Sequence, residues 1–265
     1  MTTRTLRHGD TGTEVSALQR RLVFDGHAIA VDGVYGPATE RAVRAYQRAH
    51  DLVVDGLAGP VTRAALEGAP LPATLRESDI VAAAERLGVE PAAVHAVTEV
   101  EARGCGFEPS GDPVILYERH VMYRRLGAYT DPEPWARSAP EIVNPEPGGY
   151  VGGAAEHDRL QRATAIRVTP ALESASWGLF QIMGYHWERL GYAGIGEFVA
   201  RMRESEAAHL DAFVRFVRAD SALHAALRRQ DWRAFARRYN GPAFERNDYD
   251  ARLAAAYRRH REAEV

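Results

Sequence analysis

Two glutamates, Glu101 and Glu118, have the surroundings that best suit acid–base chemistry. Glu101 falls on the same side of a predicted helix over residues 91–103 as Val94 and Val97, since a helix turns about 100° per residue. A carboxyl group on an apolar stripe is costly to ionise, so we expect the pKa of Glu101 to rise. A raised pKa suits a general acid near neutral pH.

The second carboxylate follows the glycines that end this helix. Residues 113–118 read Pro-Val-Ile-Leu-Tyr-Glu, a short apolar run that predicts a strand-like segment closed by Glu118. Glycoside hydrolases use two carboxyl groups that flank the bond they cleave, so this arrangement favours such a pair. The alternative is that Glu101 and Glu118 form structural ion pairs with Arg103 and Arg119.

A further group of polar and aromatic side chains lies in and after residues 174–184, Ser-Ala-Ser-Trp-Gly-Leu-Phe-Gln-Ile-Met-Gly. Gln181 is a single amide in an apolar run, and a buried amide requires a hydrogen-bond partner. That partner is either the backbone or the N-acetyl or hydroxyl group of a sugar. Trp177, Tyr185 and Trp187 offer flat faces that either stack on sugar rings or pack in a core.

The elements that must position these residues are almost all helical. Apolar spacing and Gly or Pro stops predict helices over residues 78–87, 91–103, 119–126, 154–175, 195–219, 232–239 and 248–261. His209 is expected on a solvated face of its helix. Residues 127–150 are rich in Pro and Gly and predict a long loop, which is often functional. The predicted fold class is therefore mainly α with little β.

The beginning of the chain contains an internal repeat. Residues 31–39, VDGVYGPAT, recur as residues 54–62, VDGLAGPVT. Each copy has a D-G turn followed by G-P, and proline is common at the first position of a helix. Short helices joined by tight glycine turns predict a compact unit of two or three helices.

Composition excludes several classes of protein. A net charge of −3 argues against a general nucleic-acid binder, and all 33 basic residues are arginine. Cys105 is the only cysteine, so no internal disulfide forms. The ten histidines show neither H-x-H nor H-E-x-x-H spacing, so no metal and no cofactor is expected. The first residues lack the apolar core of a Sec signal, so we expect synthesis in the cytoplasm without one.

Residues 5–67 resemble the three-helix type of peptidoglycan-binding domain found on cell-wall hydrolases. The resemblance rests on Gly9-Asp10-Thr11-Gly12, Leu18-Gln19, Asp32-Gly33, Tyr35-Gly36-Pro37, Thr39, Ala42-Val43 and Tyr46-Gln47. It implies binding to the peptide stem or the glycan of peptidoglycan, with candidate wall-binding residues Asp32, Tyr35, Gly36 and Asp55. A helical repeat without a ligand is the alternative. We assign residues 1–69 to this domain, 70–76 to a Pro-rich linker and 77–265 to a second domain.

Residues 77–263 resemble the lysozyme superfamily, and more specifically the N-acetylmuramidases of modular phage and prophage endolysins. The motifs that carry this likeness are Val100-Glu101, Gly104, Gly106-Phe107, Pro113, residues 115–120, residues 178–183 and Tyr239-Asn240-Gly241. Ala102 is a departure, because related lysozymes often have serine at that place. The departure puts one hydrogen bond near the acid in doubt.

The resemblance implies hydrolysis of the β-1,4 bond between N-acetylmuramic acid and N-acetylglucosamine. Glu101 would be the catalytic acid, and Glu118 either the second carboxylate or a residue that orients the site through Arg119. The implied substrate-binding residues are Gln181, Tyr239, Asn240, Ser176 and Trp177. The expected protein is a monomeric lysis enzyme of a bacteriophage that reaches the wall after release through a holin.

Several alternatives remain open from the sequence. A lytic transglycosylase acts on the same bond with one catalytic glutamate and forms 1,6-anhydro-muramyl ends. A zinc peptidase or amidase, or a wall-binding protein without catalysis, also fits the first domain. The Arg-rich helix over residues 253–261 either contacts an anionic outer membrane or is an ordinary packed helix end.

Overall fold

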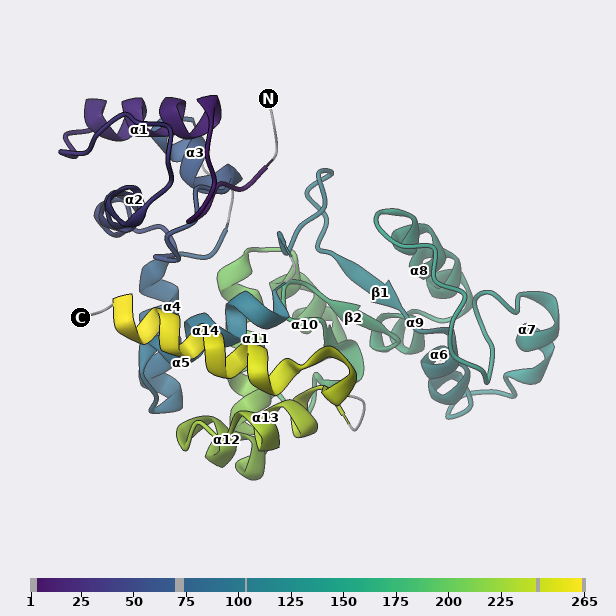
Figure 1. The fold of residues 1–265 in the computed structure, drawn as a ribbon. Helices are drawn as coiled ribbons and strands as arrows, with labels where there is room; N and C mark the ends of the chain where they lie inside the picture. Colours follow the sequence, from purple (N-terminus) through teal and green to yellow (C-terminus); the bar gives the residue numbers. More distant parts are fainter. Residues whose placement is uncertain (1–3, 70–73, 103, 242–243, 264–265) are drawn as a thin grey trace. The chain divides into compact units, whose positions relative to one another are not determined.

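The computed structural model describes residues 4–69, 74–102, 104–241 and 244–263 and is mostly helical (Figure 1). The chain divides into two compact units, Met1–Ala82 and Ala83–Val265. This division falls within helix α4, Glu77–Leu87, whereas the sequence predicts a linker over residues 70–76, of which 70–73 lie outside the described residues. The predicted fold class, mainly α with little β, is confirmed.

The first unit contains the helices α1, Thr13–Phe24, α2, Pro37–Ala49, and α3, Pro60–Leu66, before α4 begins. Helices α2 and α3 both start at the proline of the repeat, where a missing N–H costs no hydrogen bond. The helices enclose an apolar core of Leu6, Val15, Leu18, Leu22, Tyr35, Ala42, Val43, Tyr46, Leu52 and Ala58. The predicted three-helix unit is therefore present.

A buried glutamine holds the first copy of the repeat together. Gln19 is 1% exposed, and its Nε2 donates to Asp32 Oδ1 at 2.7 Å and to Thr39 Oγ1 at 3.0 Å. Its Oε1 accepts from the Gly33 amide at 2.8 Å. Gly33 has a φ of 74°, a left-handed conformation that glycine adopts without strain. The D-G turn is thus fastened to helix α1 by one side chain.

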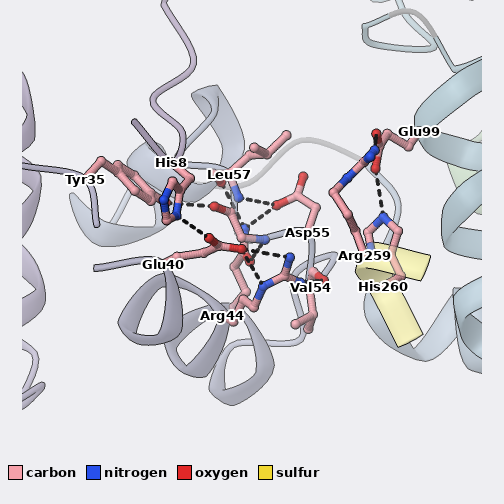
Figure 2. A network of polar contacts seen from close by, with 12 residues as sticks. His8, Tyr35, Glu40, Arg44, Val54, Asp55, Leu57, Glu99, Arg259 and His260 are labelled. Atoms are coloured by element: carbon pink, nitrogen blue, oxygen red, sulfur yellow. Dashed lines mark hydrogen bonds and ion pairs between the residues drawn. The ribbon is translucent and has the colours of Figure 1, made fainter. Parts of the chain in front are cut away.

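The second copy repeats this contact with helix α2. Gln47 Nε2 donates to Asp55 Oδ1 at 2.7 Å and to Thr62 Oγ1 at 3.1 Å, and Gly56 N donates to Gln47 Oε1 at 2.9 Å. Asp55 Oδ1 also accepts from Leu57 N at 2.8 Å (Figure 2). Gln, Asp and Thr therefore recur because each set satisfies the polar groups of one turn against one helix.

The second unit carries a small sheet among many helices. Its strands are β1 (Ile115–Tyr117), β2 (Ala175–Trp177) and β3 (Ile182–Met183). Its α-helices are α5 (Pro91–Glu101), α6 (Arg119–Leu126), α7 (Glu133–Ser138), α8 (Ala155–Ile166), α9 (Val168–Glu173), α10 (Ile195–Met202), α11 (Glu206–Arg218), α12 (Ser221–Arg228), α13 (Trp232–Tyr239) and α14 (Tyr249–Ala263). Two short 3-10 helices are η1 (Gly184–His186) and η2 (Phe244–Asn247). The strands are antiparallel in the order β1-β2-β3, with Leu116 opposite Ser176. Figure 1 shows α6 to α9 gathered at one end of β1 and β2.

The last helix of the chain supports the helix that carries Glu101. Helix α14 lies against α5 (Figure 1), and the buried rings of His95 and His260 stack with their centroids 4.7 Å apart. Glu99, which the helical spacing predicts on the other side from Glu101, accepts from His260 Nε2 at 2.9 Å and pairs with Arg259 (Figure 2). Burial acts to raise the pKa of Glu99, but these cationic partners hold it below its ordinary value.

Two features differ from the sequence-based expectations. Helix α7 lies inside the region 127–150 that was expected to be irregular. His209, expected on a solvated face, is only 1% exposed, because helix α11 is covered on more sides than its charged residues suggest. Among the described residues, no helix combines the length and apolarity needed to cross a bilayer.

Candidate active site

Glu101 is the last residue of helix α5 and is half-buried. Asn240 Nδ2 donates a hydrogen bond to Glu101 Oε1 at 2.9 Å. Asn240 is the C-cap of helix α13, so the ends of two helices far apart in the sequence meet at this carboxyl group. The motif residues Glu101 and Asn240 are thereby brought together.

Tyr239 links the same helix end to the segment that precedes Gln181. Its hydroxyl donates to the Phe180 carbonyl at 3.1 Å, and its ring stacks on Phe235 with centroids 5.6 Å apart. Burial first, and the negative charge of Glu101 second, raise the pKa of Tyr239 well above its ordinary value. The Tyr239 hydroxyl therefore remains protonated at all physiological pH values and acts as a donor.

Gln181 and Ser176 are joined at the turn between β2 and β3. Ser176 Oγ donates to Gln181 Oε1 at 2.7 Å, and Gln181 Nε2 donates to the Gly178 carbonyl at 2.8 Å and to the Val114 carbonyl at 3.3 Å. Gln181 is exposed and has a φ of 49°, which is uncommon for a residue other than glycine. Strained backbone of this kind tends to occur at functional sites. Of the two partners expected for this amide, the structure shows the backbone one.

Glu118 follows β1 and is the N-cap of helix α6. Tyr150 Oη donates to its Oε2 at 2.9 Å, and His120 Nδ1 lies 3.1 Å from the same oxygen. Arg119 instead donates to the carbonyls of Glu146 and Pro147 and so holds the loop that carries Tyr150. Glu118 and Arg119 therefore do not form the alternative ion pair with each other, and Arg103 lies outside the described residues. That Glu118 is the second carboxylate, or orients the site through Arg119, stays a prediction.

A buried ion pair that sequence reasoning missed fixes this loop to β1. Glu156 is fully buried and accepts from the amides of Val151 at 2.7 Å, Gly152 at 3.0 Å and Tyr117 at 3.2 Å. Burial acts to raise the pKa of Glu156, but these amides and Arg159, at 2.7 Å, hold it below its ordinary value. No local pattern marks Glu156, because its partners come from three separate segments.

A second missed pair joins the loop after α5 to the β2–β3 turn. Gly106 N donates to Glu206 Oε1 at 2.6 Å, and Leu179 N donates to His209 Nδ1 at 3.0 Å. A Cβ atom on Gly106 or Gly178 would lie 2.6 Å from the His209 ring, so both motif glycines are needed for its close approach. Burial lowers the pKa of His209, so the ring is neutral and able to accept this hydrogen bond.

Trp177 does not present a face to a ligand. It is 1% exposed, and its Nε1 donates to the Leu172 carbonyl at 3.2 Å, which is the core position that the sequence left open as the alternative to substrate contact. The position lies on the central strand of the sheet, where both faces are covered. Trp187 likewise donates to Glu173 Oε1 at 2.9 Å, whereas Tyr185 is 37% exposed.

The candidate wall-binding residues of the first unit have internal roles. Tyr35 is fully buried and its hydroxyl donates to the Gly56 carbonyl at 2.7 Å, so its ring packs inside the unit in this structure. Burial, with the charge of Asp55 next, raises the pKa of Tyr35. Asp32 and Asp55 fasten the two turns, and Gly36 precedes helix α2 as its N-cap. The repeat motif thus encodes folding of the unit.

Within the described part of the chain, no three His, Cys, Asp or Glu side chains are grouped to hold a metal ion. Cys105 is exposed as a residue, but its thiol is partly buried. This burial, together with the charge of nearby Glu206, raises the pKa of the thiol and disfavours the thiolate needed for nucleophilic attack.

Comparison with known proteins agrees with this arrangement. Residues 90–261 match the family described as N-acetylmuramidase, and residues 11–66 match a family described as a peptidoglycan binding domain. The crystal structure of the Burkholderia AP3 phage endolysin is similar, with 50% identity over 98% of this chain and 100% of that one and a TM-score of 0.94.

A fused Zn-dependent amidase/peptidase/peptidoglycan-binding domain-containing protein from Clostridium acetobutylicum ATCC 824 is similar over 39% of this chain and 47% of that one. Its identity is 23% and its TM-score 0.25. No curated protein matches the chain. The predicted modular organisation is confirmed: the chain belongs to the N-acetylmuramidase family of glycoside hydrolases that act on peptidoglycan, and it carries a peptidoglycan-binding domain at its N-terminus.

Proposed function

We propose that the protein is a phage-type endolysin that hydrolyses the β-1,4 bond between N-acetylmuramic acid and N-acetylglucosamine, with Glu101 as general acid. The hydrogen bond between Asn240 and Glu101 at 2.9 Å is the observation that carries this proposal. This contact supports the proposal because it orients a carboxyl group at the end of helix α5, most of which is buried. The phage endolysin with a similar structure supports the same function.

Glu101 would protonate the oxygen of the leaving sugar as the glycosidic bond breaks. Asn240 orients the carboxyl group, and Tyr239 fixes the helix end from which Asn240 reaches it. Gln181 and Ser176 are candidates for contacting the substrate, because the exposed Gln181 side chain lies at the turn that Tyr239 anchors. Glu118, held by Tyr150, is the candidate for the second carboxylate.

Replacing Glu101 with glutamine tests the assignment of the acid. The substitution keeps the size of the side chain and removes the proton that it donates, so lysis of purified peptidoglycan should fall by about 10²–10⁴-fold. Glu99→Gln, on the same helix but facing Arg259 and His260, is the matched control and should retain most of the activity. Equal activity of Glu101→Gln and the native protein would refute the assignment.

A lytic transglycosylase is the second candidate, because Glu118 already has two partners, Tyr150 and His120, and one catalytic glutamate suffices for that reaction. Mass spectrometry of the digested wall separates the two reactions. Hydrolysis leaves reducing ends, whereas a transglycosylase leaves 1,6-anhydro-muramyl ends. Glu118→Gln should be strongly impaired if Glu118 is the second carboxylate and nearly unimpaired if no second carboxylate acts.

The two functions are proposed to divide along the chain, with residues 1–69 binding the wall, residues 70–76 linking, and residues 77–265 cleaving it. Binding raises the local concentration of substrate for the catalytic unit. We further propose a monomer made in the host cytoplasm that reaches the wall after release through a holin. The exposed arginines of α14 are the candidates for contact with an anionic outer membrane, because Leu253, Ala256 and Tyr257 on the same helix are buried.

A further inference from the structure

Tyr150 is a large aromatic residue on the surface that the second unit holds in one place. It is 48% exposed, so its ring contributes little to the stability of the fold through burial. The loop that carries it is nevertheless fastened on both sides. Before Tyr150, Arg119 donates to two carbonyls of the loop at 2.9 and 3.0 Å. After it, the buried carboxylate of Glu156 accepts from the amides of Val151 and Gly152.

The turns next to Tyr150 also depend on glycine. Gly149 and Gly152, on either side of the Tyr150-Val151 pair, have φ values of 75° and 76°, which glycine adopts without strain. The backbone therefore turns sharply before and after the exposed ring. Loops that a rigid scaffold holds in this way often carry residues that bind a ligand.

The hydroxyl of Tyr150 orients the ring against Glu118. Its Oη donates to Glu118 Oε2 at 2.9 Å, and burial, followed by this hydrogen bond, raises the pKa of Tyr150, so the hydroxyl stays protonated. The hydrogen bond involves the tip of the ring and not its flat faces. About half of Tyr150 remains exposed beside a candidate active-site carboxylate.

Glu118 belongs to the less buried face of the small sheet. Along residues 113–118 every second residue is buried, and the half-buried ones are Val114, Leu116 and Glu118. Successive residues of an extended chain point to opposite faces, so these three share one face. The extended chain from Val114 to Glu118 covers about 13 Å, which is longer than a single sugar ring.

This face leads from Glu118 towards the candidate acid. Ser176 lies opposite Leu116, and Met183 lies opposite Ser176, so the three side chains form a row across the sheet. Ser176 also donates to Gln181, which directly follows the carbonyl that Tyr239 contacts. Tyr239 in turn precedes the asparagine that contacts the candidate acid. A line of side chains therefore joins the two ends of the candidate site.

The chemistry along this line suits a chain of sugar rings. A sugar donates hydrogen bonds from its hydroxyl groups, and the carboxylate of Glu118 and the amide of Gln181 both have oxygens that accept them. The faces of a sugar ring carry C–H groups, which pack against apolar and aromatic side chains. Leu116 and Met183 are half-buried apolar residues on the face, and Tyr150 supplies an exposed aromatic ring at its Glu118 end.

We propose that Tyr150 is a substrate-binding residue whose ring packs against the sugar of the glycan that lies beside Glu118. The hydrogen bond to Glu118 and the fastened loop hold the ring in position before the glycan arrives. This inference rests on the proposed cleavage of peptidoglycan and adds to it a residue outside the sequence motifs.

The test compares the full-length protein with three variants by the initial loss of turbidity of a suspension of purified peptidoglycan. At substrate concentrations well below KM this rate gives kcat/KM, and the unchanged first unit contributes equally to every variant. Tyr150→Ala removes the ring and should lower kcat/KM by about tenfold. Tyr150→Phe keeps the ring, loses one exposed hydrogen bond and should stay within about threefold of the native value. Val151→Ala, 60% exposed in the same loop, is the matched control and should be as active as the native protein.

A thermal melt of each variant fixes an assay temperature at which all are folded. If Tyr150→Ala keeps kcat/KM within twofold of the native value, the ring does not bind the glycan. If Tyr150→Phe is as impaired as Tyr150→Ala, the hydroxyl acts through Glu118 and the ring contact is overturned. If Val151→Ala is equally impaired, the shape of the loop is responsible and the inference is again wrong.

The native protein and Glu101→Gln in the same assay separate this inference from the proposed function. Lysis by the native protein and its loss in Glu101→Gln leave the proposed function standing, whatever the Tyr150 variants show. If the native protein does not reduce the turbidity, the proposed function and this inference fail together.

Discussion

Removing the amide that holds Glu101 is the most direct test of the active-site geometry. Asn240 Nδ2 lies 2.9 Å from Glu101 Oε1, so Asn240→Ala deletes one hydrogen bond to a group that is charged in part of the catalytic cycle. Hydrogen bonds to charged groups contribute about 1.5–3 kcal/mol. At about 1.4 kcal/mol for each tenfold change, kcat/KM should fall by about 10–100-fold. Asn240→Asp should lose more, because a second carboxylate beside Glu101 adds repulsion.

The assay measures the release of reducing ends from purified peptidoglycan. A thermal melt followed by circular dichroism checks that each variant is folded. Asn247→Ala is the matched control, since Asn247 is exposed at the end of η2 only a few residues further along the chain. We expect the control to retain native activity and all variants to melt close to the native protein. If Asn240→Ala keeps kcat/KM within twofold of the native value, the hydrogen bond from Asn240 does not position Glu101 for catalysis.

Two predictions concern stability and are measured by thermal unfolding. Burial, and then the charge of Arg189, lowers the pKa of His186 from 6.5 to about 4, so the unfolded chain gains its proton first as the pH falls. The free energy of unfolding should therefore decline from about pH 6.5 towards pH 4, and His186→Phe should make this decline shallower. If stability falls equally steeply with pH in the variant, His186 does not cause the decline. Gln47→Leu leaves Gly56 N and other buried groups unpaired and should lower the free energy of unfolding by about 2–4 kcal/mol. Gln161→Leu, on an exposed face, is the control and should change the stability little. Equal melting temperatures of the two variants would show that the repeat contacts do not stabilise the unit.

The local pattern of the chain predicted most of the elements correctly. Pro37 and Pro60 begin helices, and Glu101 and Glu99 lie on the two sides of α5 that the helical spacing predicts. Local rules suffice here because proline position and the period of a helix depend on neighbouring residues alone. The same rules failed for His209, whose burial depends on the β2–β3 turn and the loop after α5 packing over it.

The roles of the site residues were only partly predictable. Motifs single out Glu101 and Asn240, and the structure brings the two side chains together, while their catalytic roles stay predictions. The motifs leave open whether a ring such as that of Trp177 or Tyr35 contacts a ligand or packs in a core, because aromatic residues suit both places. Only the tertiary structure shows that both rings are buried. Glu156 holds the loop that carries Tyr150, but its role could not be predicted, because the residues around a single glutamate in the sequence do not indicate its distant partners.

The sequence by itself determined the helical class, the repeat of the first unit, the family and the identity of the candidate acid. These depend on spacing within short stretches and on motifs that can be read along the chain. Only the tertiary structure decided which polar group contacts each carboxylate and which aromatic rings are buried. The physical reason is that hydrogen bonds and burial join residues such as Glu101 and Asn240 from distant segments, and their geometry exists only once the helices have packed.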